Sequence, residues 1–152
     1  LIHHHYAKPI SRLAAQRLRK LGPGEAMEDL PVKLQPKMGF RGAYGRLHPD
    51  EPASTITGNF DYLSRGRFSH YEQDRGITLR EGARLQSFPD RFSWIASSYE
   101  GGALQIGNAV PPLLARGIAN HLARLLQASS GKIEASRPTE LEANVQLNVV
   151  SN

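Results

Sequence analysis

The sequence contains no cysteine and few aromatic residues. Without a thiol there is no disulfide, no thiolate metal site and no cysteine nucleophile anywhere in this chain. Hydrophobic residues make up 39% of the 152 positions and aromatic residues 7%, with a single tryptophan. That content is low for a chain that is compact throughout, so we expect one domain with a core, accompanied by loose ends.

Long hydrophobic runs are also missing. No stretch is apolar enough to span a bilayer and the first residues do not resemble a signal peptide, so we expect a soluble protein. What the chain has instead is positive charge, with 19 Lys and Arg against 14 Asp and Glu, a net charge of +5 and a pI near 9.8. This balance favours a polyanionic partner, and ordinary surface charge is the alternative.

The first half of the chain is predicted to hold one short helix and two strands. Ser11 is placed as the N-cap of a basic amphipathic helix over residues 11–21, and the Gly-Pro-Gly run at 22–24 ends it. Residues 25–42 are rich in Pro, Gly and Lys and read mainly as loops. The Tyr, Thr and Ile content of residues 41–47 and 53–60 predicts a small antiparallel element, with turn chemistry at 48–52.

The second half carries two helix signals. Thr78 and Glu81 are spaced as a capping box, which begins a short helix that Pro89 ends. A second helix is predicted to start at Pro111-Pro112, where a missing N–H costs nothing. Leu114, Ile118, Leu122 and Leu125 then form one apolar stripe that needs a partner surface. Beyond Gln127 the periodicity disappears, and we expect a mobile tail.

Several short motifs occur in a fixed order along the chain. They are YGRL at residues 44–47, PASTIT at 52–57, RGRF at 65–68, RGITLREGARLQSFPD at 75–90 and QIGNAVPP at 105–112. One Gln-x-Gly-Asn tetrapeptide would be weak evidence for a family, because it arises often by chance. Five blocks in a fixed order are specific evidence. Over residues 5–126 the chain resembles the DNA (cytosine-5) methyltransferases, and the last two quoted blocks are similar to that family's final two signature motifs.

The resemblance implies how the chain is organised. Members of the family combine a large Rossmann-like domain, which holds S-adenosylmethionine, with a smaller target-recognition domain. We therefore expect an α+β fold in which residues 1–76 form the target-recognition region and residues 77–104 an organising helix and connection. Residues 105–127 would form the cofactor-side turn and a C-terminal helix that returns to the large domain, and residues 128–152 the mobile tail.

The resemblance also implies a reaction, the transfer of a methyl group from S-adenosylmethionine to cytosine C5 in double-stranded DNA. In this family a cysteine thiolate first adds to C6 of the ring. This chain has no counterpart of the Gly-rich cofactor loop, the Pro-Cys loop or the Glu-Asn-Val block. We therefore predict the C-terminal, recognition portion of such an enzyme, located in the cytoplasm on DNA, which is inactive alone and needs the Rossmann-like domain of the same protein.

Three alternatives remain open from the sequence. In the first alternative, the chain is a partner subunit of a split methyltransferase. In the second, it is a non-catalytic DNA-binding module derived from such an enzyme. The nucleic acid is also open, because tRNA and DNA are both polyanions and charge does not separate them.

The candidate DNA-binding residues lie in three of the motifs. Thr55 and Ile56 match the family's Thr-Leu/Ile pair, which contacts DNA beside the flipped base, and Thr57 follows them. A guanidinium matches phosphate or guanine edges with paired donors, which makes arginine suited to the same surface. The predicted arginines are Arg46, Arg65 and Arg67. The alternative for residues 55–57 is an ordinary strand whose composition has no role in binding. The alternative for the arginines is that they are solvated surface residues.

The candidate cofactor-binding residues lie in the QIGNAVPP block. By resemblance this turn closes the methionine end of the S-adenosylmethionine pocket, where the small glycine permits close backbone approach and the Asn108 amide both donates and accepts. The set is Gln105, Gly107, Asn108, Ala109 and Val110. The alternative is a simple turn before the following helix.

Other chemistry-bearing residues are given structural roles. Arg80 and Arg84 share one helix face, and we favour a scaffold role over DNA contact. Trp94 is expected to pack in a core rather than to stack on a base. The adjacent histidines, His4 among them, are interpreted as solvated residues of an unanchored terminus, or as the family's Asn-His pair, and we predict no metal site.

Overall fold

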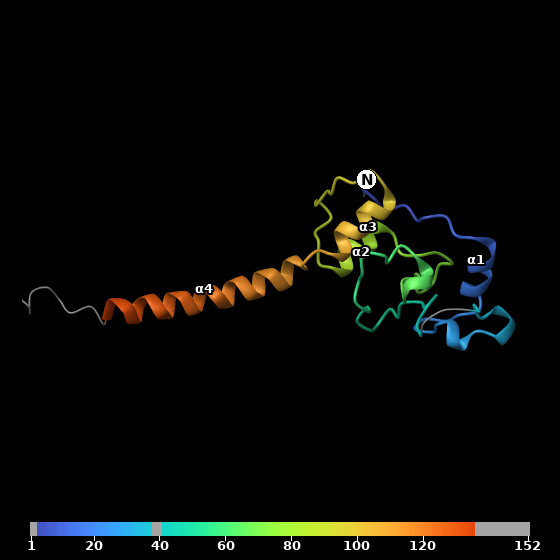
Figure 1. Ribbon diagram of the computed structural model, residues 1–152, viewed down its shortest axis with the longest axis horizontal. Coiled ribbons are helices and arrows are strands. Elements are labelled where there is room, and N and C mark those ends of the chain that lie inside the picture. Colours follow the sequence, from blue (N-terminus) through green and yellow to red (C-terminus); the bar gives the residue numbers. More distant parts are fainter. Residues whose placement is uncertain (1–2, 38–40, 136–152) are drawn as a thin grey trace, which may run out of the picture. The chain divides into compact units, whose positions relative to one another are not determined.

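The computed structural model describes residues 3–37 and 41–135. Its helices are α1 (Arg12–Leu18), α2 (Leu79–Leu85), α3 (Tyr99–Gly107) and α4 (Pro112–Ala135), with single 3-10 turns at Met27–Asp29, Val32–Leu34 and Leu63–Arg65. The chain divides into two compact units, Leu1–Pro112 and Leu113–Asn152. The first unit contains α1, α2 and α3 joined by long irregular segments (Figure 1).

No regular strand occurs in the described residues, so the strand predictions for residues 41–47 and 53–60 are wrong. Isolated bridges stand in their place, a parallel one between Arg46 and Ser69 and an antiparallel one between Ser69 and Gly76. The backbone at Tyr44 adopts a φ of 57° and at Gly42 a φ of 87°. Left-handed residues interrupt an extended ladder, which explains why strand composition did not give a strand over residues 41–47. The α+β class itself stays a prediction.

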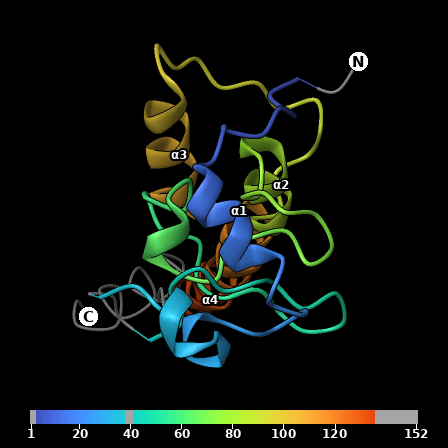
Figure 2. The same cartoon turned by 90° about the vertical axis from the view of Figure 1, so that its right-hand side faces the viewer.

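The short helix α1 forms where the sequence predicts it and ends earlier. The Ser11 hydroxyl accepts from the Ala14 N–H at 3.1 Å, which confirms the predicted N-cap. The helix stops at Leu18, and the chain then turns before the Gly-Pro-Gly run. In the ribbon, α1 lies beside the 3-10 turns that follow it in the sequence (Figure 2). Its inner face contributes to a small core. That core consists of Ala14, Leu18, Leu21, Leu30 and Leu63.

The capping box at α2 is confirmed. The Thr78 hydroxyl accepts from the Glu81 N–H at 3.1 Å, and the Glu81 carboxylate accepts from the Thr78 N–H at 2.7 Å. Arg75 adds a two-pronged ion pair, donating to the two carboxylate oxygens at 2.7 and 2.8 Å. The helix ends at Leu85, because Ser87 takes a left-handed φ of 62° before Pro89 is reached.

The sequence analysis did not predict α3. Its first turn contains Gly101 and Gly102, which weaken any helix signal. A Cβ on Gly102 would lie 2.7 Å from the Leu79 side chain, so glycine is what lets α3 pack closely on α2 (Figure 1). The main core gathers around this contact and contains Ile56, Phe60, Phe68, Ile77, Leu79, Ala83, Trp94, Ala103 and Ile106.

Arg80 and the N-terminal segment belong to the same packing. Arg80 is fully buried and donates to the carbonyls of His3, Pro89 and Phe92 at 3.1, 3.3 and 2.8 Å. Its guanidinium lies 4.6 Å from the centre of the Trp94 ring. The predicted scaffold role of Arg80 and the packing role of Trp94 are therefore confirmed. His4 is anchored rather than solvated, since it stacks on Trp94 with ring centres 4.5 Å apart, while His3 and His5 are exposed.

The helix α4 begins at Pro112 as predicted. It continues to Ala135, so the irregular tail does not begin at Gln127, and residues 136–152 of the predicted tail lie outside the described residues. Leu114, Ile118, Leu122 and Leu125 are each 51–55% exposed and form an uncovered apolar stripe. Among the described residues no helix is long and apolar enough to cross a membrane.

The Glu81 network should make stability fall in acid. Burial raises the pKa of Glu81, but the hydrogen bonds from Arg75 and from the Thr78 N–H outweigh it and lower the pKa from 4.5 to about 2. A depressed carboxyl pKa stabilises the fold above pH 4.5, and this contribution is lost as the pH falls toward about 2. We expect Glu81→Gln to lower the free energy of unfolding by about 1–2 kcal/mol at pH 7, measured by urea unfolding.

Asp90→Asn is the matched control, because Asp90 pairs with Arg84 at an exposed site. Exposed pairs contribute little, so this variant should unfold like the original chain. The Glu81→Gln variant should also show a flatter dependence of stability on pH between 4.5 and about 2. An unchanged acid dependence would contradict the role given to Glu81.

Candidate nucleic-acid interface

Four of the predicted DNA-binding residues line one open hollow of about 730 Å³. They are Thr55, Thr57, Arg65 and Arg67. The hollow also contains Arg41, which the sequence analysis left in a predicted strand, together with Glu28 and Asp29 on its acidic side. Four segments that are separate in the sequence therefore meet at one surface, and three of the lining side chains are guanidiniums.

The threonines reach this surface because of alternation along an extended segment. Ile56 is 7% exposed and packs in the main core, while Thr55 and Thr57 on either side are exposed. Successive side chains of an extended chain point in opposite directions, so burial of Ile56 turns both hydroxyls outward. Ile56 itself does not line the hollow, since its side chain is part of the core.

Arg65 and Arg67 lie in a tight turn, and the residues on both sides of this turn are buried. Leu63 and Phe68 are buried on either side of Arg65-Gly66-Arg67, and both arginines are exposed. A Cβ on Gly66 would lie 2.6 Å from the Phe68 ring, so the turn requires glycine. On the neighbouring segment, a Cβ on Gly45 would lie 2.3 Å from Cγ of Arg67. The stem of Arg67 therefore lies directly on the backbone of the neighbouring segment.

Arg46 does not belong to this surface. Its side chain is 4% exposed, and its terminal nitrogens donate to the carbonyls of Leu18, His70 and Gln73 at 2.7–2.9 Å. The same group pairs with Asp74 at 2.5 Å. A guanidinium with these contacts has no free face for phosphate, so we remove Arg46 from the DNA-contacting set and assign it a structural role. Nothing in the sequence separates it from Arg65, because burial depends on distant segments.

The five predicted cofactor residues lie at the end of α3 and just after it. Gln105 donates to the carbonyl of Ile95 at 2.9 Å, and Asn108 is the exposed C-cap of the helix. Val110 is 62% exposed. The predicted turn is therefore the last turn of a helix, and it leaves Asn108 and Val110 facing solvent.

Gly107 serves packing. A Cβ at this position would lie 2.2–2.3 Å from backbone atoms of Thr57 and Gly58. A Cβ on Gly58 would in turn lie 3.5 Å from the Asn108 amide oxygen. The close backbone approach predicted for Gly107 is thus made to the recognition segment of this same chain. It brings the predicted DNA-binding and cofactor-binding residues into direct contact.

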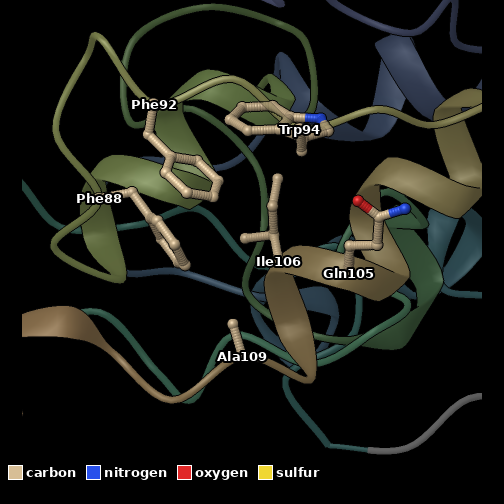
Figure 3. A pocket seen from close by; sticks show the side chains of 6 residues that line it. All are labelled: Phe88, Phe92, Trp94, Gln105, Ile106 and Ala109. Carbon is tan, nitrogen blue, oxygen red and sulfur yellow. The ribbon is translucent and has the colours of Figure 1, made fainter. Parts of the chain in front are cut away.

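A small apolar pocket of about 140 Å³ adjoins this turn (Figure 3). Its aromatic walls are Phe88, Phe92 and Trp94, and Ile106 points toward them from α3 (Figure 3). Gln105 and Ala109 also line it. Two of the five candidate cofactor residues therefore face an apolar surface that sequence reasoning did not identify.

One further polar cluster was missed. Lys8 donates to Asp61 at 3.0 Å and to Glu100 at 2.5 Å, and it lies 4.2 Å from the centre of the Tyr62 ring. Burial lowers the pKa of Lys8, but the hydrogen bonds to Glu100 and Asp61 outweigh it and raise the pKa above its ordinary value. These contacts connect the N-terminal segment to residues 61–62 and to α3. Within the described part of the chain, no three metal-ligating side chains come together.

The sequence is similar to known proteins over most of its length. The C-5 cytosine-specific DNA methylase family matches residues 16–124. Over 125 residues the chain is 37% identical to the type II methyltransferase M1.HphI of Haemophilus parahaemolyticus, covering 82% of this chain and 32% of that protein. Over 133 residues it is 35% identical to the type II methylase M.HgiDII of Herpetosiphon aurantiacus, covering 81% and 38%.

A third relative is the DNA (cytosine-5-)-methyltransferase M.ApeKI of Aeropyrum pernix, which is 45% identical over 91 residues, 59% of this chain and 19% of that protein. The chain thus spans less than two fifths of the length of each of these three relatives.

Stability should separate Arg46 from the arginines of the hollow. Arg46→Met removes a buried guanidinium that donates to Asp74 and to the carbonyls of Leu18, His70 and Gln73. The carbonyls of Leu18 and Gln73 each keep a backbone donor, whereas the His70 carbonyl loses the donor that it has in the fold. We expect it to lower the free energy of unfolding by roughly 2–4 kcal/mol. Arg65→Ala, at an exposed site, should change it by less than about 0.5 kcal/mol. Urea unfolding of the two variants measures the difference, and equal effects would contradict the structural role of Arg46.

Gly107→Ala tests the contact between the two predicted sets. Backbone atoms at 2.2–2.3 Å cannot move as a flexible side chain does, so the variant should lose about 2 kcal/mol or more of stability. Gly117→Ala is the control, because a Cβ there meets nothing within 4 Å and alanine favours a helix. Thermal unfolding followed by circular dichroism should show a loss for the first variant and none for the second.

Proposed function

Because this chain belongs to the C-5 cytosine-specific DNA methylase family, we propose that it supplies the DNA-recognition and cofactor-side portion of a DNA (cytosine-5) methyltransferase. The observation that carries the proposal is the shared hollow, where Thr55, Thr57, Arg65 and Arg67 meet although they come from separate segments. In the complete enzyme another segment, or a partner subunit, carries the nucleophilic cysteine.

The chemistry of the hollow suits a DNA backbone. A cytosine inside a duplex is out of reach of a nucleophile, so an enzyme of this class must extrude the base and hold the displaced strand. Hydroxyls and guanidiniums are the groups that position phosphates, and they do so without reading sequence. The exposed pair Thr55 and Thr57 offers hydroxyls, and Arg65 and Arg67 offer paired cationic donors beside them.

The residues after α3 fit a role at the edge of an S-adenosylmethionine pocket. The Asn108 side chain is exposed and makes no hydrogen bond within the described residues, so its amide is available to donate and accept. Ala109 and Val110 would form the adjoining apolar wall. When bound, the cofactor supplies the methyl group. Gln105 and Gly107 support the turn from behind, through Ile95 and Thr57 respectively.

The contact of Gly107 with Thr57 gives the two roles a common frame. The recognition segment and the cofactor-side turn share backbone contacts, so a DNA strand held at Thr55 and Thr57 has a fixed position relative to Asn108. Catalysis of group transfer depends on such positioning, because the reacting groups must meet in a near-attack geometry. The missing thiolate, which adds to C6, must come from outside this chain.

The absence of cysteine also supports a second candidate, a DNA-binding module without catalysis. Transfer of a radiolabelled methyl group from S-adenosylmethionine to duplex DNA distinguishes the two. We expect the full product of the gene to incorporate label as 5-methylcytosine and the 152-residue chain alone to incorporate none. If neither incorporates label while both bind DNA, the binding module is the correct function. A tRNA substrate in parallel tests the choice of nucleic acid.

DNA binding by the 152-residue chain tests the hollow directly. Replacing Arg65 and Arg67 together by alanine should weaken binding to duplex DNA. It should also reduce the slope of log affinity against log salt by about 2, roughly 1 for each lost phosphate contact. Arg91→Ala is the control, since it removes an exposed arginine that does not line the hollow. Fluorescence anisotropy over a salt series measures both quantities, and a variant that matches the control would contradict the site.

A further inference from the structure

We infer that Arg41 is a third DNA-contacting arginine, and that Glu28 holds it in the DNA-free chain and is exchanged for a phosphate on binding. This inference rests on the proposed function, because it takes the hollow to be the DNA site. No sequence motif marks either residue, and both are identified by their place in the hollow.

Arg41 is free to reach a ligand. Its side chain is 95% exposed and lines the same hollow as Arg65 and Arg67. The turn that presents it is fixed, because the Gly42 N–H donates to both oxygens of the Glu28 carboxylate at 3.1 and 3.2 Å. An anchored backbone with an exposed guanidinium is the arrangement expected of a residue that binds an anion.

Arg41 and Arg67 stand on one wall because their segments are tied together. The Tyr44 N–H donates to the Leu63 carbonyl at 2.7 Å, and the Ser69 N–H donates to the Gly45 carbonyl at 3.0 Å. These bonds lie on either side of the contact between Gly45 and the stem of Arg67. A DNA strand bound by Arg67 therefore lies close to the neighbouring segment, which carries Arg41.

Glu28 lines the hollow with a carboxylate, as does Asp29. Its Oε1 lies 3.8 Å from Nε of Arg41, a single long contact at an exposed site, which is a weak ion pair. A phosphate offers a guanidinium two parallel, charge-assisted hydrogen bonds, which are stronger. The exchange is therefore favourable, and the released Glu28 keeps its bond to the Gly42 N–H. Asp29 has a different task, since it accepts from the Ala26 N–H at 2.9 Å.

A double-mutant cycle on the 152-residue chain tests the exchange, with a duplex DNA oligonucleotide as the probe. Arg41→Ala should weaken binding and reduce the salt slope by about 1, whereas Arg91→Ala should leave the slope nearly unchanged. Glu28→Gln keeps an acceptor for the Gly42 N–H and removes the charge, so it should tighten binding. In the Arg41→Ala background that gain should disappear, because the two effects act through one contact.

Each alternative outcome has a definite meaning. If Arg41→Ala matches Arg91→Ala while the Arg65 and Arg67 double variant loses affinity, the inference is overturned and the proposed function stands. If Glu28→Gln tightens binding equally with and without Arg41, Glu28 acts through the general field and the exchange is overturned. If the unmodified chain does not bind duplex DNA, the proposed function fails and the inference fails with it. Thermal unfolding of each variant verifies that it is folded. If Glu28→Gln does not fold, the salt dependence of DNA binding by Arg41→Ala still tests whether Arg41 contacts DNA.

Discussion

The first unit of this chain depends on two buried guanidiniums that satisfy backbone carbonyls. Buried carbonyls must find donors, and a unit without regular strands in its described residues has few ladders to provide them. Arg46 donates to three carbonyls from two segments, and Arg80 donates to three more from the N-terminal segment and the loop after α2. These two side chains replace the hydrogen bonding that a sheet would have supplied.

This arrangement explains why arginine has two opposite roles in the same unit. A guanidinium offers five donors in a planar fork, which suits converging carbonyls inside the protein as well as phosphates outside it. Arg46 and Arg80 are buried, whereas Arg41, Arg65 and Arg67 are exposed around the hollow. The side that an arginine faces is decided by the packing of its neighbours, since the residue type serves both purposes equally well.

The sequence predicted the features whose cause is local. The cap at Ser11, the capping box at Thr78 and the start of α4 at Pro112 each depend on residues within one turn, and all three are confirmed. The strand over residues 41–47 failed because bridging to Ser69 and left-handed residues, rather than composition, decide the backbone there. Residues 53–60 form no bridge in the described structure, and they end in a turn at 58–60.

The helix α3 escaped prediction for a related reason. Gly101 and Gly102 lower its intrinsic propensity, while contact with α2 stabilises it. The residues of the candidate site likewise divide into those that the sequence identifies and those that depend on distant contacts. The resemblance grouped Thr55, Thr57, Arg65 and Arg67, which the structure brings to one hollow. It also included Arg46, which is buried against Leu18 and Asp74, far from it along the chain. Arg41 had no motif to mark it.

Gly107 shows how a residue predicted for a ligand can serve the protein. Its missing side chain was expected to admit a cofactor, yet the space is occupied by the backbone of Thr57 and Gly58. The requirement for glycine is the same in both interpretations, so the sequence alone could not separate them. The structural interpretation has the larger consequence for function. A backbone contact that tolerates no Cβ leaves the segment of Thr57 little freedom to move independently of the turn that carries Asn108. Under the proposed function, this close packing fixes where a DNA strand held at Thr57 lies relative to the cofactor side.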